Sequence, residues 1–377
     1  MSAGCGITGA LVVGGGLAGS MLAMRLSAAG REVTLLEKER CAHHKVCGEF
    51  LSREAVEYLR EADIHPLKLG ASSIHSVRLS VKRKQVEARL PFAALSISRY
   101  VLDEALLARA AERGCRVERG AGVEGLSRHD GAWLAELRDG SSWSAETVFL
   151  ANGKHDLRGM KREQGKQGDM VGFKLHWRLA PAQTQALRGF MELFLFRGGY
   201  GGLSLVEGDA ANLCLVVRRG ELRRLGGWNE LLASIRAHNE VLRERLEGAA
   251  ALWDRPLAVT AIPYGHLAGR SDGLWCVGDQ AAVIPSFTGD GMSIALHSAA
   301  VAARMYLAGD SADAYHQRLR AQLKPGMGLA TLLSRAMMSG VGRWVAPVGL
   351  AVFPGAIEWI ARSTRIPEAP AVGQTLA

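Results

Sequence analysis

The stretch "ALVVGGGLAGSMLAMRLSAAGREVTLLEKE", residues 10–39, decides the fold. Its apolar beginning predicts a buried strand that runs into a glycine-rich turn. The next segment has apolar residues at helical spacing and stops at Gly30, and "EVTLLE" then predicts a second strand. A strand, a helix and a second strand in this order indicate a βαβ unit, which belongs to the α/β class.

Three glycines in the turn, Gly14, Gly16 and Gly19, stand in the register G-x-G-x-x-G. The first allows a tight turn, the second lets the backbone approach a pyrophosphate, and the third permits close packing of helix on strand. The helix N-terminus favours negative charge there, and Glu37 at the end of the second strand can accept from ribose hydroxyls. The unit therefore predicts dinucleotide binding through Gly14, Gly16, Leu17, Ala18, Gly19, Glu37 and Lys38.

The overall composition is that of a globular protein. Its 377 residues are 48% apolar and 22% charged, enough for a large core and more than one structural unit. The net charge of +9 suits an anionic partner, but the basic residues are dispersed and no nucleic-acid-binding motif organises them, so we expect no nucleic-acid partner. No secretory signal precedes the first strand, which favours a cytoplasmic location. We expect free thiols at Cys5, Cys41, Cys47, Cys115, Cys214 and Cys276.

A second motif lies far downstream, in "GLWCVGDQAAVIPSFTGDGMSIALHSAAVAARMYL", residues 273–307. It predicts a short strand, a loop and a long helix that opens at "TGDG". Asp279 can accept from ribityl hydroxyls, and the N–H groups of the helix start can face the flavin edge that becomes anionic on reduction. Because NAD lacks such an edge, the motif indicates FAD, with contacts at Gly278, Asp279, Pro285, Gly289, Asp290, Gly291 and Met292.

With these two motifs together, the chain resembles the FAD-dependent oxidoreductases that include para-hydroxybenzoate-hydroxylase-type monooxygenases and geranylgeranyl reductases. The resemblance covers most of residues 8–310, and Arg99 with Asp103 matches an Arg-x-x-x-Asp pattern before a helix. Asn152-Gly153 stands where the monooxygenases have Asp-Gly, which weakens any nicotinamide role transferred to that segment.

The resemblance implies a Rossmann-like FAD-binding domain of the glutathione-reductase type, interleaved with an antiparallel-sheet substrate domain and followed by C-terminal helices. We expect the FAD-binding domain at residues 1–75, 98–165 and 264–310. The substrate domain is expected at residues 76–97 and 166–263, and the C-terminal helices at residues 311–377.

The segment "CAHHKVCGEF", residues 41–50, gathers soft metal ligands, but four of them within seven residues would need a very tight fold-back. We expect no metal. The segment resembles the Lys-x-Cys-Gly stretch that crosses near the flavin in this family, which implies that Lys45 faces the pyrophosphate and that Cys47 and Gly48 line the flavin pocket. By the same resemblance Cys47 is a candidate active-site thiol; the alternative is a buried cysteine packed under the cofactor. We expect His43 and His44 on the loop surface.

Residues 168–262 show strand-like runs separated by glycine-rich turns, which predicts an antiparallel sheet. Its segment "GGYGGLSLV" stands where geranylgeranyl reductases carry Tyr-x-Trp-x-Phe-Pro. Tyr200 remains as a candidate catalytic residue at the substrate, and Gly202 replaces the tryptophan. The Trp-x-Trp-x-Ile-Pro signature of flavin-dependent halogenases is missing from the chain.

The apolar C-terminal stretch, residues 337–366, is interrupted by Pro347, Pro354, Arg343 and Glu358, so it does not predict a membrane span. We interpret it as core-packing helices, with a cap over the substrate cavity or peripheral membrane contact as the alternatives.

The function that follows is a FAD-dependent monooxygenase that uses NAD(P)H and O2 to hydroxylate a small apolar, aromatic substrate, free or bound to a carrier protein. NAD(P)H would dock transiently, because we find one nucleotide-binding fingerprint in the chain. One alternative is a flavin-dependent reductase of carbon–carbon double bonds in an isoprenoid-like lipid, with Cys47 near the reacting bond. Another is a flavoprotein that acts as a binding module without turnover.

Overall fold

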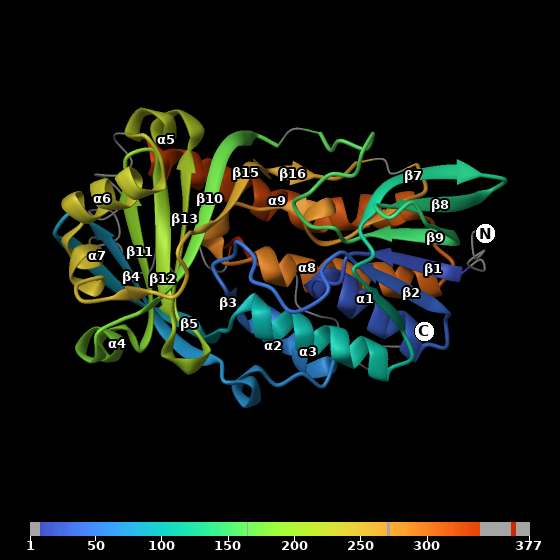
Figure 1. Cartoon of the computed structure of the whole chain (residues 1–377), viewed down its shortest axis with the longest axis horizontal. Coiled ribbons are helices and arrows are strands. Elements are labelled where there is room, and N and C mark those ends of the chain that lie inside the picture. Colours follow the sequence, from blue (N-terminus) through green and yellow to red (C-terminus); the bar gives the residue numbers. More distant parts are fainter. Residues whose placement is uncertain (1–7, 164, 270–271, 340–362, 367–377) are drawn as a thin grey trace.

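The computed structural model describes residues 8–163, 165–269, 272–339 and 363–366. In this part of the chain, two sheets lie next to each other along the long axis, with helices packed against both (Figure 1). The predicted βαβ unit is confirmed as β1 (Thr8–Val13), α1 (Leu17–Ala28) and β2 (Val33–Glu37). Strands β1 and β2 pair in parallel, and their burial on both faces explains their continuous apolar sequence.

The first sheet has the order β6-β2-β1-β9-β8-β7, and β17 pairs with β9 outside this path. Strands β6 (Arg116–Arg119), β9 (Ser142–Leu150) and β17 (Trp275–Cys276) join β1 and β2 in parallel. Strands β7 (Val123–His129) and β8 (Ala132–Leu137) form an antiparallel extension. The short β17 therefore brings the second motif beside the first.

The second sheet has the order β14-β10-β13-β12-β11-β4-β5-β3, and β15 also pairs with β10. The strands are β3 (Phe50–Leu51), β4 (Ser72–Val81), β5 (Lys84–Ser96), β10 (Gln167–Arg178), β11 (Gly189–Phe196), β12 (Gly199–Leu205), β13 (Ala211–Arg218), β14 (Ala250–Ala251) and β15 (Leu257–Tyr264).

This sheet is antiparallel, as predicted, except between β4 and β11, which pair in parallel. The sequence pattern did not predict this parallel pair. Between β4 and β11 the chain forms strands of the first sheet, so no hairpin sets the relative direction of the two strands. Two short strands, β16 (His266–Leu267) and β18 (Ala282–Val283), form a separate ladder.

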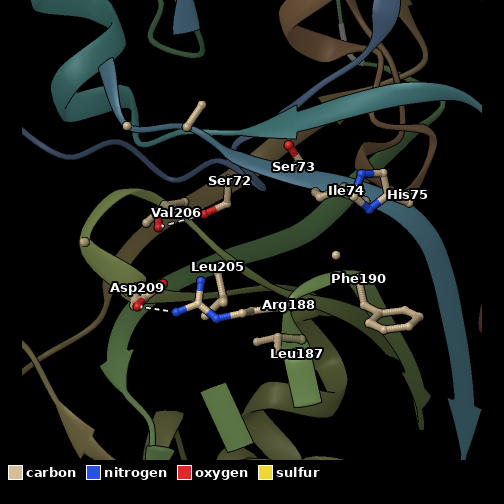
Figure 2. Close-up of a pocket in the computed structure, with 14 residues that line it drawn as sticks. Ser72, Ser73, Ile74, His75, Leu187, Arg188, Phe190, Leu205, Val206 and Asp209 are labelled. Carbon is tan, nitrogen blue, oxygen red and sulfur yellow. Dashed lines mark hydrogen bonds and ion pairs between the residues drawn. The ribbon is translucent and has the colours of Figure 1, made fainter. Parts of the chain in front are cut away.

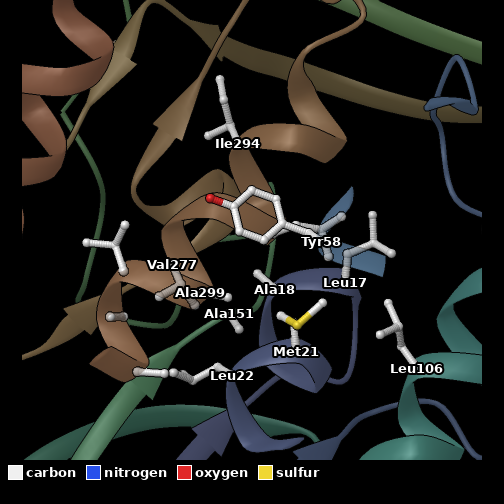
Figure 3. Packing of buried hydrophobic residues seen from close by; sticks show 14 of the residues in the cluster. Leu17, Ala18, Met21, Leu22, Tyr58, Leu106, Ala151, Val277, Ile294 and Ala299 are labelled. Atoms are coloured by element: carbon white, nitrogen blue, oxygen red, sulfur yellow. The ribbon is translucent and has the colours of Figure 1, made fainter. Parts of the chain in front are cut away.

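Helices α1, α3 (Arg99–Glu112) and α8 (Gly291–Leu307) pack around the first sheet. Figure 3 shows side chains of this packed core, among them Leu17 and Met21 of α1, Leu106 of α3 and Ile294 of α8. Helix α2 (Arg53–Glu61) packs on α8, and the 3-10 turn η1 (Pro66–Leu69) leads into β4. The start of α8 is thereby held by apolar contacts on several sides.

One face of the second sheet is covered by α5 (Arg219–Leu225), α6 (Trp228–His238) and α7 (Glu240–Arg245), and α4 (Pro181–Leu187) packs against β11 and β12 (Figure 1). Side chains on that face, such as Phe173 and Leu215, form an apolar core with these helices. Side chains alternate along a strand, so the neighbouring positions point to the opposite face, toward the first sheet. That opposite face carries the candidate site.

Helix α9 (Ala312–Met338) follows α8. The apolar C-terminal stretch, residues 337–366, lies for the most part outside the described residues, and so do the helices predicted for it. In the part of the chain that is described, no helix combines the length and the apolar character needed to cross a membrane.

Candidate active site

The glycine turn between β1 and α1 leaves no room for side chains. Gly14 has a φ of +107°, and a Cβ atom built on it would lie 2.6 Å from the carbonyl oxygen of Ala151. A Cβ atom on Gly19 would overlap the carbonyl oxygen of Gly14. The turn therefore presents bare backbone at the N-terminus of α1, which is the geometry that a pyrophosphate requires.

Two cations lie at this turn. The Arg99 Nη2 and Lys45 Nζ atoms are 3.3 Å and 3.5 Å from the place of a Cβ atom on Gly16. Both are held by Asp103, which accepts from Lys45 Nζ at 2.8 Å and from Arg99 Nε at 2.6 Å. Burial raises the pKa of Asp103, but the adjacent cations outweigh burial and lower it, so the carboxylate is charged at neutral pH. Asp103 thus anchors the two phosphate-binding candidates.

Glu37 ties the end of β2 to the same turn. Its carboxylate accepts from the N–H of Gly15 at 2.7 Å and from the N–H of Glu39 at 2.9 Å. Lys38, by contrast, is exposed and pairs with Glu39 at 3.6 Å, so the structure does not bring it to Gly16. The glycine turn, Lys45 and Arg99 together form what we call the phosphate cradle. Of the contacts predicted in this unit, Lys38 is the one that lies away from this cradle.

Replacing Arg99 with leucine is expected to weaken FAD binding about tenfold to hundredfold. The physical reason is the loss of one charge-assisted hydrogen bond, worth about 1.5–3 kcal/mol, while Lys45 continues to neutralise Asp103. The measurement is the dissociation constant of FAD by fluorescence quenching. Arg109→Leu, on the same helix but bound only to surface groups, is the control and should leave the constant unchanged; equal losses in both variants would contradict the assignment.

The second motif forms a 3-10 turn, η3 (Gly278–Gln280), directly after β17. Lys154 Nζ pairs with Asp279 Oδ2 at 3.1 Å, and Gln280 Nε2 donates to the carbonyl oxygen of Gly153 at 2.7 Å. A Cβ atom on Gly278 would lie 3.0 Å from Cβ of Ala18 on α1. The two predicted cofactor motifs therefore meet in space, and residues 152–155 join them.

The start of α8 corrects one expectation. The N–H of Gly289 donates to the carbonyl oxygen of Ser286, and the N–H of Asp290 donates to Thr288 Oγ1, both at 3.2 Å. These donors are used because a 3-10 turn, η4 (Ser286–Thr288), precedes the helix. Gly291 and Met292 are then the first helical residues, and their N–H groups are the ones that can face a flavin edge.

The Asp290 side chain also has a role that was not predicted. It is fully buried and accepts from Arg365 Nη1 at 2.8 Å, which ties the described C-terminal residues to the start of α8. Burial raises the pKa of Asp290 to about 6.

The loop around Cys47 crosses the face of the second sheet that points toward the first sheet. Val46 lies against Gly172 of β10, and Asn212 Nδ2 of β13 donates to the carbonyl oxygen of Cys47 at 3.1 Å. The N–H of Glu49 donates to Cys47 Sγ at 3.4 Å. Because Lys45 lies two residues away at the phosphate cradle, Cys47 sits between that cradle and the sheet.

Glu49 is a site residue that the sequence pattern did not reveal. It is fully buried, with a φ of +57°, and its carboxylate accepts from the backbone N–H of Arg99 at 2.8 Å, from His176 Nε2 at 2.9 Å and from Lys174 Nζ. Burial raises the pKa of Glu49, but His176 and Lys174 outweigh it and lower the pKa overall. The sequence signal for Glu49 was a charged residue next to Cys47-Gly48. Its side-chain partners, Lys174 and His176, lie on β10, far along the chain.

The expectation for His44 was wrong. It is half-buried rather than on the loop surface, and its ring stacks on Tyr100 and contacts Trp253 and His176 at centroid distances of 4.9, 4.5 and 5.0 Å. Burial and nearby Lys174 lower the pKa of His44 to about 4, so it is neutral at pH 7. The sequence did not reveal these contacts, because His176 lies on β10 and Trp253 in the bend after β14, both far along the chain.

His44, Glu49 and His176 place potential metal-ligand atoms within 4.8 Å of one another. The Lys174 ammonium, however, bonds the same carboxylate and would repel a divalent cation. We therefore assign no metal to this cluster.

Tyr200 lies where the sheet meets the loop before α8. Its hydroxyl is 3.1 Å from Ser286 Oγ, and Tyr264 donates to the same oxygen at 2.9 Å. Phe287 contacts the Tyr200 ring edge-to-face at 6.0 Å. Around them are the buried apolar side chains of Leu195, Met170, Val216 and Ile262. This apolar wall lies on the same sheet face as the Cys47 loop.

A cavity of about 420 Å³ opens elsewhere, at one end of strands β4, β11 and β12 of the second sheet (Figure 2). Ser72, His75, Arg188 and Phe190 are among its lining residues, and Arg188 pairs with Asp209 there at 2.6 Å. None of the predicted site residues lines it. A much smaller space at the glycine turn, about 10 Å³, is bordered by Gly15, Glu37, Lys45, Arg99 and Asp103. The larger cavity therefore lies away from the predicted cofactor-binding residues.

Comparison with known proteins covers the segment that contains the glycine turn, Lys45, Arg99 and Asp103. Residues 8–149 match a family model described as a FAD binding domain, so the chain contains such a domain. The chain is 29% identical over 168 residues to the protein FixC of Escherichia coli K12, a match that covers 42% of this chain and 39% of the length of that relative.

A further relative is digeranylgeranylglycerophospholipid reductase 2 of Methanopyrus kandleri. It is 26% identical over 304 residues, which cover 76% of this chain and 73% of that protein.

Solved structures show the same fold. The flavin-dependent brominase Bmp2 superimposes with a TM-score of 0.77 at 16% identity, over 95% of this chain and 93% of that one. The myxobacterial chondrochloren halogenase CndH gives a TM-score of 0.75 at 17% identity, over 96% and 91% of the two chains. The FAD-binding domain, the shared fold and the relatives together support a FAD-dependent oxidoreductase.

Proposed function

We propose that this protein is a FAD-dependent monooxygenase, which uses NADH or NADPH and O2 to hydroxylate an apolar aromatic substrate. The observation that carries the proposal is the apolar wall around Tyr200, which lies on one sheet face with the Cys47 loop and against the loop before α8. A substrate on that wall would be enclosed by the two segments that would border a bound flavin. Apolar lining with a few polar groups is typical of small-molecule sites.

FAD, when bound, supplies the electron transfer and oxygen activation. The glycine turn, Lys45 and Arg99 would hold its phosphates, and Asp279 would hold its ribityl chain. The helix start at Gly291 and Met292 would stabilise negative charge on the flavin. The Tyr200 wall positions the substrate and excludes water.

Double-bond reduction in a lipid is the second candidate. It is supported by the archaeal reductase relative, which matches three quarters of this chain, and by Cys47 at the substrate face. Gly202 counts against it because the wall lacks the tryptophan of the reductase motif at this position. Halogenation is not proposed, since the chain lacks the tryptophan signature of that class.

Rapid mixing separates the two candidates. The flavin of the holoprotein is reduced without oxygen, mixed with oxygenated buffer containing 4-ethylphenol, and followed by absorbance. A transient spectrum distinct from both oxidised and reduced flavin, together with 4-ethylcatechol as product, is expected for the monooxygenase. Direct return of oxidised flavin and hydrogen peroxide with every phenol tested would contradict it. Anaerobic turnover with a polyprenyl lipid would then favour reduction.

A further inference from the structure

Asn212 on β13 carries a buried oxygen that lacks a partner. The residue is 1% exposed, and its Nδ2 donates to the carbonyl oxygen of Cys47 at 3.1 Å, which sets the orientation of the amide. Its Oδ1 has no hydrogen-bond partner among the described residues. Buried acceptors without a donor are rare in folded proteins, and each one calls for a bound group or water that the protein chain does not supply.

Lys174 on the adjacent strand β10 has hydrogen-bond donors that are not used. Its side chain has no exposed surface, and Glu49 is the acceptor that the described part of the chain provides for it. An ammonium has three N–H donors, so two remain for another acceptor. The Glu49 carboxylate neutralises its charge, so the site does not depend on an anionic ligand.

The strand register places these two groups together. In the antiparallel β10–β13 pair, His176 lies opposite Asn212 and Lys174 lies opposite Cys214. Lys174 and Asn212 are therefore diagonal neighbours on one sheet face, about 7–8 Å apart at Cα. The Cys47 loop crosses the same face.

We infer that Lys174 and Asn212 form a polar subsite that binds a hydroxyl group of the substrate, a phenol if the proposed function holds. The hydroxyl oxygen accepts a hydrogen bond from Lys174 Nζ, and the hydroxyl O–H donates one to Asn212 Oδ1, so a single group is a partner for both side chains. An ether or a carboxylate accepts but cannot donate, and an ammonium group would face Lys174. The inference rests on the proposed function for the aromatic class of the substrate, and it adds the group by which that substrate is held.

The test compares two probes on the FAD-loaded protein: 4-ethylphenol, and 4-ethylanisole, in which a methyl group replaces the phenolic hydrogen so that the oxygen accepts but cannot donate. Binding is followed by perturbation of the flavin spectrum and by ligand-observed NMR. We expect the phenol to bind about tenfold more tightly to the wild-type protein, the equivalent of about one hydrogen bond. Asn212→Leu should reduce this preference below about threefold. Asn212→Ala replaces it if the leucine variant does not fold.

Ser204→Ala is the matched control, because Ser204 lies opposite Asn212 on β12 and bonds Ser96 rather than the Cys47 loop. It should retain the tenfold preference. Equal binding of both probes by the wild-type protein would overturn the inference and assign the unpaired atoms to water. Loss of FAD from Asn212→Leu would also overturn it, because the subsite would then belong to the cofactor. A retained phenol preference without any hydroxylation would refute the proposed function but leave the subsite standing.

Discussion

Replacing Gly19 with alanine is expected to release FAD and to lower the stability of the protein by about 3 kcal/mol. The new methyl group would overlap the carbonyl oxygen of Gly14, which is backbone and cannot rotate away. Helix α1 would have to move off β1, and the N–H groups at its start would leave the phosphate position. Flavin content after gel filtration and the melting temperature check both effects.

Gly328→Ala is the control for this prediction. Gly328 is also helical, in α9, but it is exposed and a Cβ atom built on it has open space. Alanine there should stabilise the helix by up to about 1 kcal/mol and leave the flavin bound. If Gly19→Ala retained its flavin at wild-type stability, the close contact of α1 with the turn would be refuted.

Replacing Glu49 with glutamine is expected to cost about 3–5 kcal/mol of unfolding free energy, because the buried Lys174 ammonium loses its countercharge. Glutamine keeps the size of the side chain, so the change tests charge rather than packing. Chemical denaturation provides the measurement. The double variant Glu49→Gln, Lys174→Met should recover a large part of the loss, because no unpaired charge then remains.

Glu57→Gln is the matched control, since Glu57 pairs with the exposed Arg53 on the surface of α2. Its loss should stay within about 1 kcal/mol. Equal effects of the two glutamine variants would show that the Glu49 network is not buried in solution.

The Glu49 network also predicts a pH dependence. The pKa of Glu49 is lowered in the folded protein, so its contribution to stability is complete above the ordinary glutamate value of 4.5 and is lost as the pH falls through the lower folded value. The stability difference between wild type and Glu49→Gln should therefore be constant near neutral pH and shrink below pH 4.5. A difference that grows on acidification would have the wrong sign for this network.

The cofactor site was predictable because its signals are local. Gly14, Gly19 and Glu37 lie within one βαβ unit, where spacing along the chain translates directly into positions in space. The turn at Asp279 followed from a second local pattern. Lys38 and the N–H groups of Gly289 and Asp290 did not follow, because the exact partners of a loop residue depend on the turn that contains it.

The chain sequence by itself determined the α/β class, the dinucleotide turn and the two motifs that indicate FAD, because each depends on residues that are neighbours in sequence. Only the tertiary structure decided which side chains surround the Cys47 loop. Lys174 and His176 of β10, Asn212 of β13 and Trp253 after β14 lie far along the chain from Cys47 and Glu49, and sheet pairing over long sequence distances brings these side chains together. Hydrophobic patterning specifies that strands form and which face is buried, but which polar side chains then share a face depends on strand order and register.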